Sequence, residues 1–246
     1  MGRYKLIALD MDGTLLNDHQ QISEENRTWL HKALDAGVTV MLSTGRGVQS
    51  IYPYIEQLNM LMPIVAVNGG EVWKEPHVLL KRHLLPVSAV RELHALAVRY
   101  DTWFWGYAVE GLFNKERWTD DIGSLRWLKF GFHTENDDNR RRIRETLERA
   151  GAFEITNSHP HNLEINPKGV SKASGIREIC DLLGIAMSEV VAMGDSLNDL
   201  AMVREAGLGV AMGNAQEALK EAADLVTVTN NENGVAKVIK EYVLRK

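Results

Sequence analysis

Two acids follow a short apolar run near the start of the chain, and their spacing is suited to chemistry. The stretch LIALDMDGTLL, residues 6–16, places Asp10 and Asp12 directly after four apolar residues and before a glycine and a threonine. Neighbouring carboxylates at the end of a buried strand repel one another and lose hydration. The pattern therefore indicates a place where negative charge is needed, as in the binding of a hard cation such as Mg²⁺.

Polar residues with complementary chemistry follow the other apolar runs. These residues are Ser43, Thr44, Asn68, Asp195, Asn198, Asp199 and Asn214, with Lys172 at the opening of a helix. Hydroxyls, exposed backbone amides and a lysine are suited to holding a phosphate, and clustered carboxylates to holding Mg²⁺. One such acid alone would more often be a helix cap or a solvated loop residue. A whole set of them at strand ends indicates phosphoryl transfer.

Strands and helices alternate in the segments that carry these residues. In residues 1–80 the pattern predicts strands at 5–10, 38–43 and 63–70, and helices at 50–58 and at 23–37, the latter capped by Ser23. After residue 170 it predicts strands at 189–195, 208–215 and 224–229, with helices at 171–184, 196–207, 216–223 and 234–246. Runs that are apolar on both faces and separated by helices are typical of a parallel sheet covered on both sides. Ligands bind beyond the carboxyl ends of such strands, so the polar residues are expected to meet at one edge.

The middle of the chain has a different composition and pattern. All five phenylalanines and four of the six tryptophans lie between residues 103 and 153. Five strand-like runs are grouped there around helices expected at 86–100 and 137–151, which is typical of an α+β unit. We therefore expect residues 1–80 and 167–246 to form a Rossmann-like α/β core domain, and residues 81–166 to form an α+β domain inserted into it.

Length, charge and cysteine content exclude several classes of protein. The chain has 246 residues, a net charge of −5 and a pI near 5.9, which argues against general affinity for nucleic acid or anionic membranes. Cys180 is its only cysteine, so no internal disulfide is expected and a cytoplasmic location is the simplest interpretation. The first residues lack the long apolar core and cleavage site of a signal peptide, so we expect none, and no apolar segment approaches the roughly 20 residues that span a bilayer.

Four motifs in order resemble those of the haloacid dehalogenase superfamily. DMDGT at 10–14 resembles the first motif, STGR at 43–46 the second, VSKAS at 170–174 the lysine motif, and GDSLND at 194–199 the fourth. The later GVAMGNA and NENGVAKVI resemble the ends of Cof-type phosphatases, whose cap domain, of type IIB, is inserted between the second and third motifs. The resemblance implies a phosphatase with a haloacid dehalogenase-like core and a cap.

The resemblance also implies a role for each motif residue. Asp10 is implied as the nucleophile that forms an aspartyl-phosphate, and Asp12 as the acid and base, with Lys172 neutralising charge. Mg²⁺ is implied on the Asp10 and Asp195 carboxylates and the Asp12 carbonyl, with Asp199 supporting the metal through water or another ligand. The implied phosphate-binding residues are Ser43, Thr44, Gly45, Lys172 and Asn198.

Several residues keep alternative interpretations. Lys168 lies four residues before Lys172 and is the alternative phosphate-side lysine, although it falls in the turn NPKG. Arg46 is expected to contact substrate or to form a salt bridge at the start of a helix.

The predicted insert carries further residues with two interpretations. Trp103, Trp105 and Tyr107 share one strand face; we expect them to pack on the helices of the insert, with a substrate ring or sugar as the alternative. For His159, His161, Asn162 and Glu164 we expect a solvated loop, with contact to the pocket as the alternative for some of them.

The leading hypothesis is a Mg²⁺-dependent phosphatase that acts on a small phosphorylated metabolite, either a sugar phosphate or a nucleotide- or cofactor-related monoester. A phosphomutase would use the same Asp10 but protect the phosphoenzyme from water. A phosphoacceptor or metabolite-binding protein without hydrolytic activity is the alternative from another class, and intact Asp10, Asp12, Lys172 and Asp195 argue against it.

Overall fold

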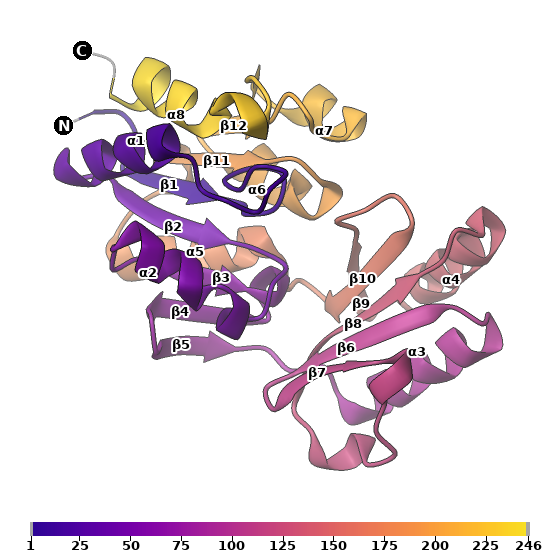
Figure 1. The fold of residues 1–246 in the computed structure, drawn as a ribbon. Coiled ribbons are helices and arrows are strands. Elements are labelled where there is room, and N and C mark those ends of the chain that lie inside the picture. Colours follow the sequence, from indigo (N-terminus) through magenta and orange to yellow (C-terminus); the bar gives the residue numbers. More distant parts are fainter. Residues whose placement is uncertain (1, 245–246) are drawn as a thin grey trace.

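Two sheets organise the chain in this computed structural model, which describes residues 2–244 (Figure 1). The larger sheet has eight strands, which in spatial order are β13 (Leu225–Val226), β12 (Leu208–Ala211), β11 (Val190–Gly194), β1 (Leu6–Leu9), β2 (Thr39–Ser43), β3 (Ile64–Ala66), β4 (Glu71–Glu75) and β5 (Val78–Arg82). The first six of these strands run parallel, and β4 and β5 add an antiparallel hairpin at the edge. The sequence predicted the parallel strands but not the hairpin.

Helices cover both faces of the larger sheet, because its strands are apolar on both sides. They are α1 (Glu24–Asp35), α2 (Tyr52–Leu58), α5 (Lys172–Leu183), α6 (Leu200–Glu205), α7 (Glu217–Ala222) and α8 (Gly234–Val238), which continues as a π-helix over Ile239–Val243. In Figure 1, α1 and α2 lie in front of the sheet and α5 behind it. Arg245 and Lys246, the end of the helix predicted at 234–246, lie outside the described residues.

Local sequence signals explain where two of these helices begin. The Ser23 side chain accepts a hydrogen bond from the Asn26 amide and caps α1, as predicted. Pro53 lies in the first turn of α2, where its missing N–H costs nothing. No described helix is both long enough and apolar enough to cross a membrane.

The smaller sheet is antiparallel and belongs to the middle of the chain. Its strands in spatial order are β7 (Gly111–Asn114), β6 (Trp103–Ala108), β8 (Trp127–His133), β10 (Asn162–Pro167) and β9 (Phe153–Thr156). Two helices, α3 (Val87–Arg99) and α4 (Asp137–Ala150), cover one face and share a second apolar core with it. We call residues 87–167 the insert.

The arrangement of the two sheets positions the site. Figure 1 shows the sheet of the insert between its two helices and the larger sheet, so that its uncovered face lies toward the larger sheet. The α/β class with an inserted α+β unit is confirmed. The domain boundaries near residues 81 and 167 stay a prediction.

Candidate active site

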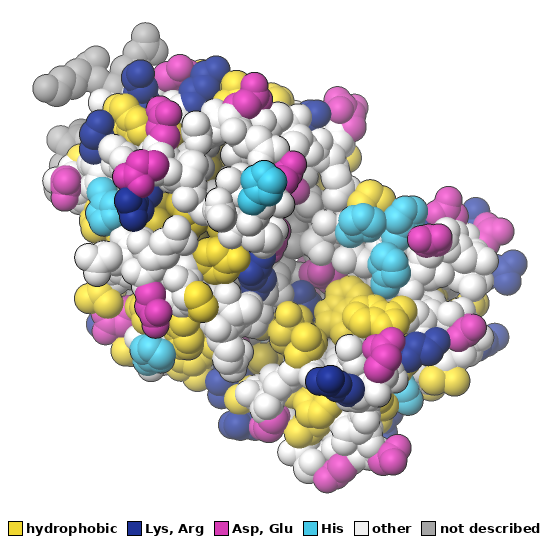
Figure 2. Space-filling model, in the orientation of Figure 1, with side chains coloured by type: hydrophobic (Ala, Val, Ile, Leu, Met, Phe, Trp, Pro, Cys, Tyr) yellow, Lys and Arg dark blue, Asp and Glu magenta, His cyan; other side chains and the backbone are white. Residues whose placement is uncertain are grey.

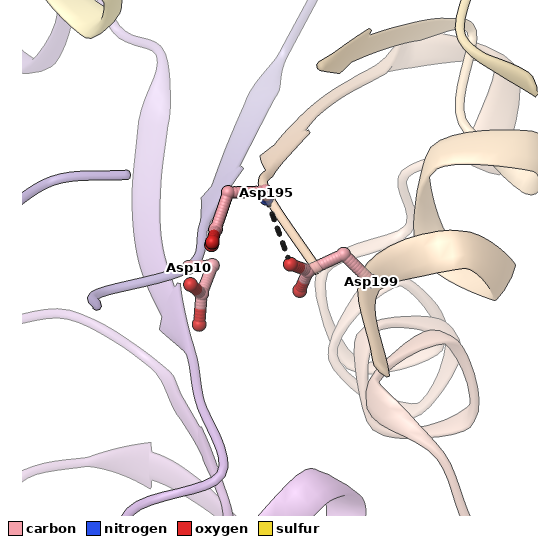
Figure 3. A group of neighbouring side chains, drawn as sticks. All are labelled: Asp10, Asp195 and Asp199. Carbon is pink, nitrogen blue, oxygen red and sulfur yellow. Dashed lines mark hydrogen bonds between the residues drawn. The ribbon is translucent and has the colours of Figure 1, made fainter. Parts of the chain in front are cut away.

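Three aspartates meet at the carboxyl end of the parallel strands. Asp10 follows β1, Asp195 follows β11, and Asp199 lies on the short helical turn behind Asp195 (Figure 3). Strands β1 and β11 are paired in parallel, with Leu9 opposite Met193, so the two following loops start side by side. Each aspartate offers a carboxylate oxygen, and these oxygens all lie within 4.8 Å of one another. At this separation the carboxylates of Asp10 and Asp195 are close enough to share one ion.

Backbone geometry keeps two of these carboxylates in place. The Asp199 carboxylate accepts hydrogen bonds from the Asp195 amide at 3.0 Å and the Ser196 amide at 3.1 Å. Gly13 has a left-handed φ of +73°, and a Cβ there would stand 2.6 Å from an Asp195 oxygen. Only glycine fits at this turn, which explains the glycine of the DMDGT stretch.

Lys172 is completely buried between two of the acids. Its Nζ donates to Asp10 Oδ1 at 2.6 Å and to Asp199 Oδ1 at 2.6 Å. The lysine opens α5 directly after Ser171, which caps the helix. The rival Lys168 is exposed and donates to the Gly151 carbonyl at 2.8 Å, away from the cavity. The structure therefore brings Lys172, and not Lys168, to the acids.

The charge of this cluster is incompletely compensated. Burial raises the pKa of Asp10 well above its ordinary value, and the carboxylates of Asp199 and Asp195 add to that against the opposing Lys172. Burial, assisted by the Asp199 carboxylate, raises the pKa of Asp195 to about 6. Two buried acids and the half-buried Asp195, with one ammonium beside them, form a strongly electronegative pocket, which is the environment that a divalent cation relieves.

Asp12 faces the same cavity but is paired with a different cation. The Arg46 guanidinium donates to both of its carboxylate oxygens, at 2.7 Å and 2.5 Å. Partial burial would raise the pKa of Asp12, but the Arg46 contacts outweigh it and lower this pKa. Of the two expectations for Arg46, the structure shows the salt bridge, although both residues also line the cavity.

The predicted phosphate-binding residues do not all reach the cavity surface. Thr44, Gly45 and Asn198 line it, and the Thr44 hydroxyl accepts a hydrogen bond from the Arg46 amide at 3.2 Å. Ser43 is the last residue of β2 and completely buried, and its hydroxyl has no hydrogen-bond partner among residues 2–244. Ser43 lies beneath the cavity-lining residues.

The cavity has a volume of about 410 Å³ and lies between the core and the insert. The cleft is visible in Figure 2. Its insert wall consists of six side chains, which are Trp105, Tyr107, Lys129, Ser158, Asn162 and Glu164. Aromatic faces, a buried ion pair and small polar groups therefore stand opposite the acids.

Two expectations about this wall were wrong. Trp105 and Tyr107 face the cavity, because the neighbouring Phe104 and Ala108 point to the helices of the insert and fill its apolar core. Asn162 and Glu164 are buried cavity residues rather than solvated ones, whereas His159 is exposed.

Lys129 and Ser158 were not identified from the sequence. Lys129 is opposite Tyr107 in the sheet and stands alone among apolar residues of β8. The available signal was one charged residue on an otherwise apolar strand. A residue of opposite charge, Glu164, lies on the neighbouring strand β10.

Comparisons with known proteins agree with this geometry. The family model of the haloacid dehalogenase-like hydrolases matches residues 7–137 and 114–239. The 5-amino-6-(5-phospho-D-ribitylamino)uracil phosphatase YcsE of Bacillus subtilis is 46% identical over 240 residues, covering 98% of this chain and 96% of that protein. A haloacid dehalogenase-like hydrolase structure from B. subtilis superposes with a TM-score of 0.88 at 25% identity, covering 97% of this chain and 99% of that one. A subclass IIB sugar phosphatase shares the fold with a TM-score of 0.85 at 22% identity, over 98% of this chain and 100% of that one.

Proposed function

The chain belongs to the haloacid dehalogenase-like hydrolase family and is a phosphatase, and we propose that it hydrolyses a small phosphomonoester through a covalent phosphate on Asp10. The observation that carries the proposal is the buried Lys172 bridging Asp10 and Asp199 at the end of β1, beside Asp195 and the cavity. This arrangement presents a nucleophile, a fixed positive charge and a cation site to one reacting group.

The donor set fits Mg²⁺. Carboxylate oxygens are the ligands this ion prefers, and three of them converge with only one ammonium to balance them. Asp10 and Asp195 would hold the ion with the Asp12 carbonyl, and Asp199 would support them through its contacts with the Asp195 loop. When bound, Mg²⁺ supplies charge stabilisation for a phosphate dianion approaching a carboxylate.

The side chains of this chain account for both halves of the reaction. An Asp10 carboxylate oxygen attacks phosphorus, and the bond between phosphorus and the alcohol oxygen breaks. Lys172 holds Asp10 Oδ1 and fixes the direction of the carboxylate. In the second half, water attacks phosphorus, the acyl-phosphate bond breaks, and inorganic phosphate leaves Asp10 in its starting form.

We assign the proton transfers to Asp12. In the first half it gives a proton to the leaving alcohol, and in the second it takes one from water. The ionised form, favoured by Arg46, is the form needed for the second half. The first half requires the Arg46 contact to loosen, so that the Asp12 carboxyl carries a proton when substrate is bound.

The remaining contacts hold the phosphate. Thr44 and the Gly45 backbone line the cavity next to Asp10 and present donors to phosphoryl oxygens. Asn198, which also lines the cavity, contributes amide hydrogens. Ser43, buried below the cavity, supports this loop without touching the substrate.

The insert wall supports a leaving group with a planar ring and hydroxyl groups. YcsE is named for a substrate that carries a phosphate on a ribityl chain joined to an aminouracil. Trp105 and Tyr107 offer aromatic faces for such a ring, and Ser158 and Asn162 offer hydrogen bonds to hydroxyls. We propose this compound or a close analogue as the substrate. A cytoplasmic location is part of the proposal, in keeping with the single buried Cys180.

Hydrolysis of a generic aryl phosphate tests the proposed chemistry. The wild-type protein should release phosphate only with added Mg²⁺, and Asp10→Asn should abolish release. Asp181→Asn, which alters an exposed carboxylate on α5, is the matched control and should behave as wild type. Activity that persists in Asp10→Asn would refute the covalent mechanism.

The substrate class is tested by a panel of phosphorylated metabolites ranked by kcat/KM. Ribityl-aminouracil phosphate should have a higher kcat/KM than simple sugar phosphates. Trp105→Ala should reduce the ratio between these two kcat/KM values. A panel in which simple sugar phosphates rank first would contradict the substrate class while leaving the chemistry intact.

A further inference from the structure

A buried chain of polar side chains runs from the insert to the candidate phosphate site. Glu164 on β10 accepts a hydrogen bond from Asn68 Nδ2, and Asn198 Nδ2 donates to Asn68 Oδ1 at 3.3 Å. Glu164, Asn68 and Asn198 are 4%, 2% and 6% exposed, so solvent does not compete for these contacts. Asn198 is the only member of the three assigned to phosphate above.

Glu164 is held as an ionised carboxylate. Burial alone would raise its pKa, but the Lys129 ammonium and hydrogen bonds from Ser158 and Asn68 outweigh burial and lower this pKa. Lys129 Nζ lies 3.1 Å from Glu164 Oε2 and also donates to the Gly45 carbonyl at 2.9 Å. Ser158 donates to Glu164 Oε1 at 2.7 Å. The carboxylate is therefore fixed in place and anchored to the loop that carries Thr44 and Gly45.

The ionised carboxylate dictates the direction of both amides. A carboxylate only accepts hydrogen bonds, so Asn68 must turn its NH₂ group toward Glu164 and its oxygen toward Asn198. Asn198 must then turn its NH₂ group toward Asn68, which uses one N–H and leaves the second free. Asn198 Oδ1 is buried and has no partner among residues 2–244, so nothing described on that side opposes the orientation.

The backbone around Asn68 has an unusual conformation, which fixes the position of the Asn68 side chain. Val67 and Asn68 have φ of +53° and +55°, and a β-branched residue in the left-handed region is strained. The Asn68 amide donates to the Thr44 carbonyl at 3.0 Å. Gly69 follows with φ +95°, and a Cβ there would stand 2.3 Å from the Ser171 carbonyl oxygen.

We propose that Glu164 is a positioning residue for phosphate binding, which acts through Asn68 to present an N–H of Asn198 to the phosphoryl group. The inference rests on the proposed function and extends it to a residue of the insert that touches no reacting atom. Without the carboxylate, Asn68 is free to reverse its amide, and Asn198 then presents a carbonyl oxygen that repels phosphate. The insert thus supports phosphate binding as well as contacting the leaving group.

Inhibition by inorganic phosphate isolates this role, because phosphate has no leaving group. Glu164→Gln keeps the shape of the side chain but can donate a hydrogen bond, so the direction of Asn68 is no longer imposed. We expect its inhibition constant for inorganic phosphate to rise about tenfold, the scale of one hydrogen bond to a charged group. Discrimination between aryl phosphate and a sugar phosphate, measured as a ratio of kcat/KM values, should not change.

Two further variants complete the test. Asn68→Ala keeps the Lys129–Glu164 pair and should raise the inhibition constant similarly, which covers the case in which Glu164→Gln fails to fold. In the Asn198→Ala background, Glu164→Gln should add no further effect. Glu110→Gln, which removes an insert carboxylate paired with Arg126 away from the cavity, is the control and should match wild type.

Two outcomes would overturn the inference. One is an unchanged inhibition constant with altered discrimination between substrates, which would make Glu164 a contact to the leaving group. The other is a Glu164→Gln effect that adds in full to Asn198→Ala. Failure of the proposed function is distinct, because wild type itself would then show no Mg²⁺-dependent hydrolysis.

Discussion

Replacing Lys172 by methionine tests how the buried acids are held together. Lys172 is completely buried, with 2.6 Å contacts to both Asp10 and Asp199. The two carboxylates raise its pKa although burial would lower it, so the ammonium is charged in the folded protein. Methionine fills nearly the same space without charge. Removing one partner of a buried pair costs about 3–5 kcal/mol, because the remaining charges are left uncompensated.

Chemical denaturation in the presence of a chelator measures this cost directly. Lys172→Met should lower the free energy of unfolding by about 3–5 kcal/mol relative to wild type. At a Mg²⁺ concentration a hundred times the wild-type Kd, wild type should gain about 2.7 kcal/mol. The variant should gain more at the same concentration, because its more negative site binds Mg²⁺ more tightly. Turnover of an aryl phosphate should fall about 10²–10³-fold, as when one preorganised donor is removed from a charged transition state.

Lys168→Met is the matched control. Lys168 is exposed and bonds only the Gly151 carbonyl, so its replacement should stay within about 0.5 kcal/mol of wild type and keep full turnover. Equal unfolding free energies for Lys172→Met and wild type would refute the argument from buried charge. A loss of turnover in Lys168→Met instead would show that the alternative lysine acts on phosphate.

Three further predictions follow from individual contacts. Asp12→Asn should slow hydrolysis of alkyl phosphates far more than of aryl phosphates, because a poor leaving group depends on a proton donor. Steady-state assays with both substrates measure this, and an equal loss of turnover with the two would argue against the acid role. Gly69→Ala should lower the free energy of unfolding, measured by urea denaturation, by on the order of 2–4 kcal/mol, since its Cβ would stand 2.3 Å from the Ser171 oxygen. Gly37 has a φ of +82° but open space around it, so Gly37→Ala should lower the same free energy by only about 1 kcal/mol. The folded pKa of Glu164 lies below its ordinary value of 4.5, so its contribution to stability is complete above that value and lost as the pH falls through the folded pKa. The stability difference between wild type and Glu164→Gln should therefore shrink on acidification, and a constant difference would contradict the lowered pKa.

The parallel strands, the helices between them and the composition of the acid site could be predicted from the sequence. Apolar runs of strand length separated by amphipathic segments leave few arrangements besides a parallel sheet. Once the strands are parallel, residues that follow them must meet at one edge, which brings Asp10 to Asp195 across 185 residues of chain. The motif spacing also selected Lys172 over Lys168, and the structure places only Lys172 beside the acids.

Pairing that joins distant segments could be decided only by the tertiary structure. Alternation along β6 showed that Trp105 and Tyr107 share a face, but not whether that face meets helices or the core, because both faces carry aromatic residues. The Arg46 contact to Asp12 and the Glu164 contact to Asn68 join residues 34 and 96 positions apart. Local periodicity fixes the direction of a side chain within its own element, and it carries no information on how the insert is oriented against the core. That orientation comes from packing between the insert and the core. It brings Lys129, a charged residue on an otherwise apolar strand, to the cavity.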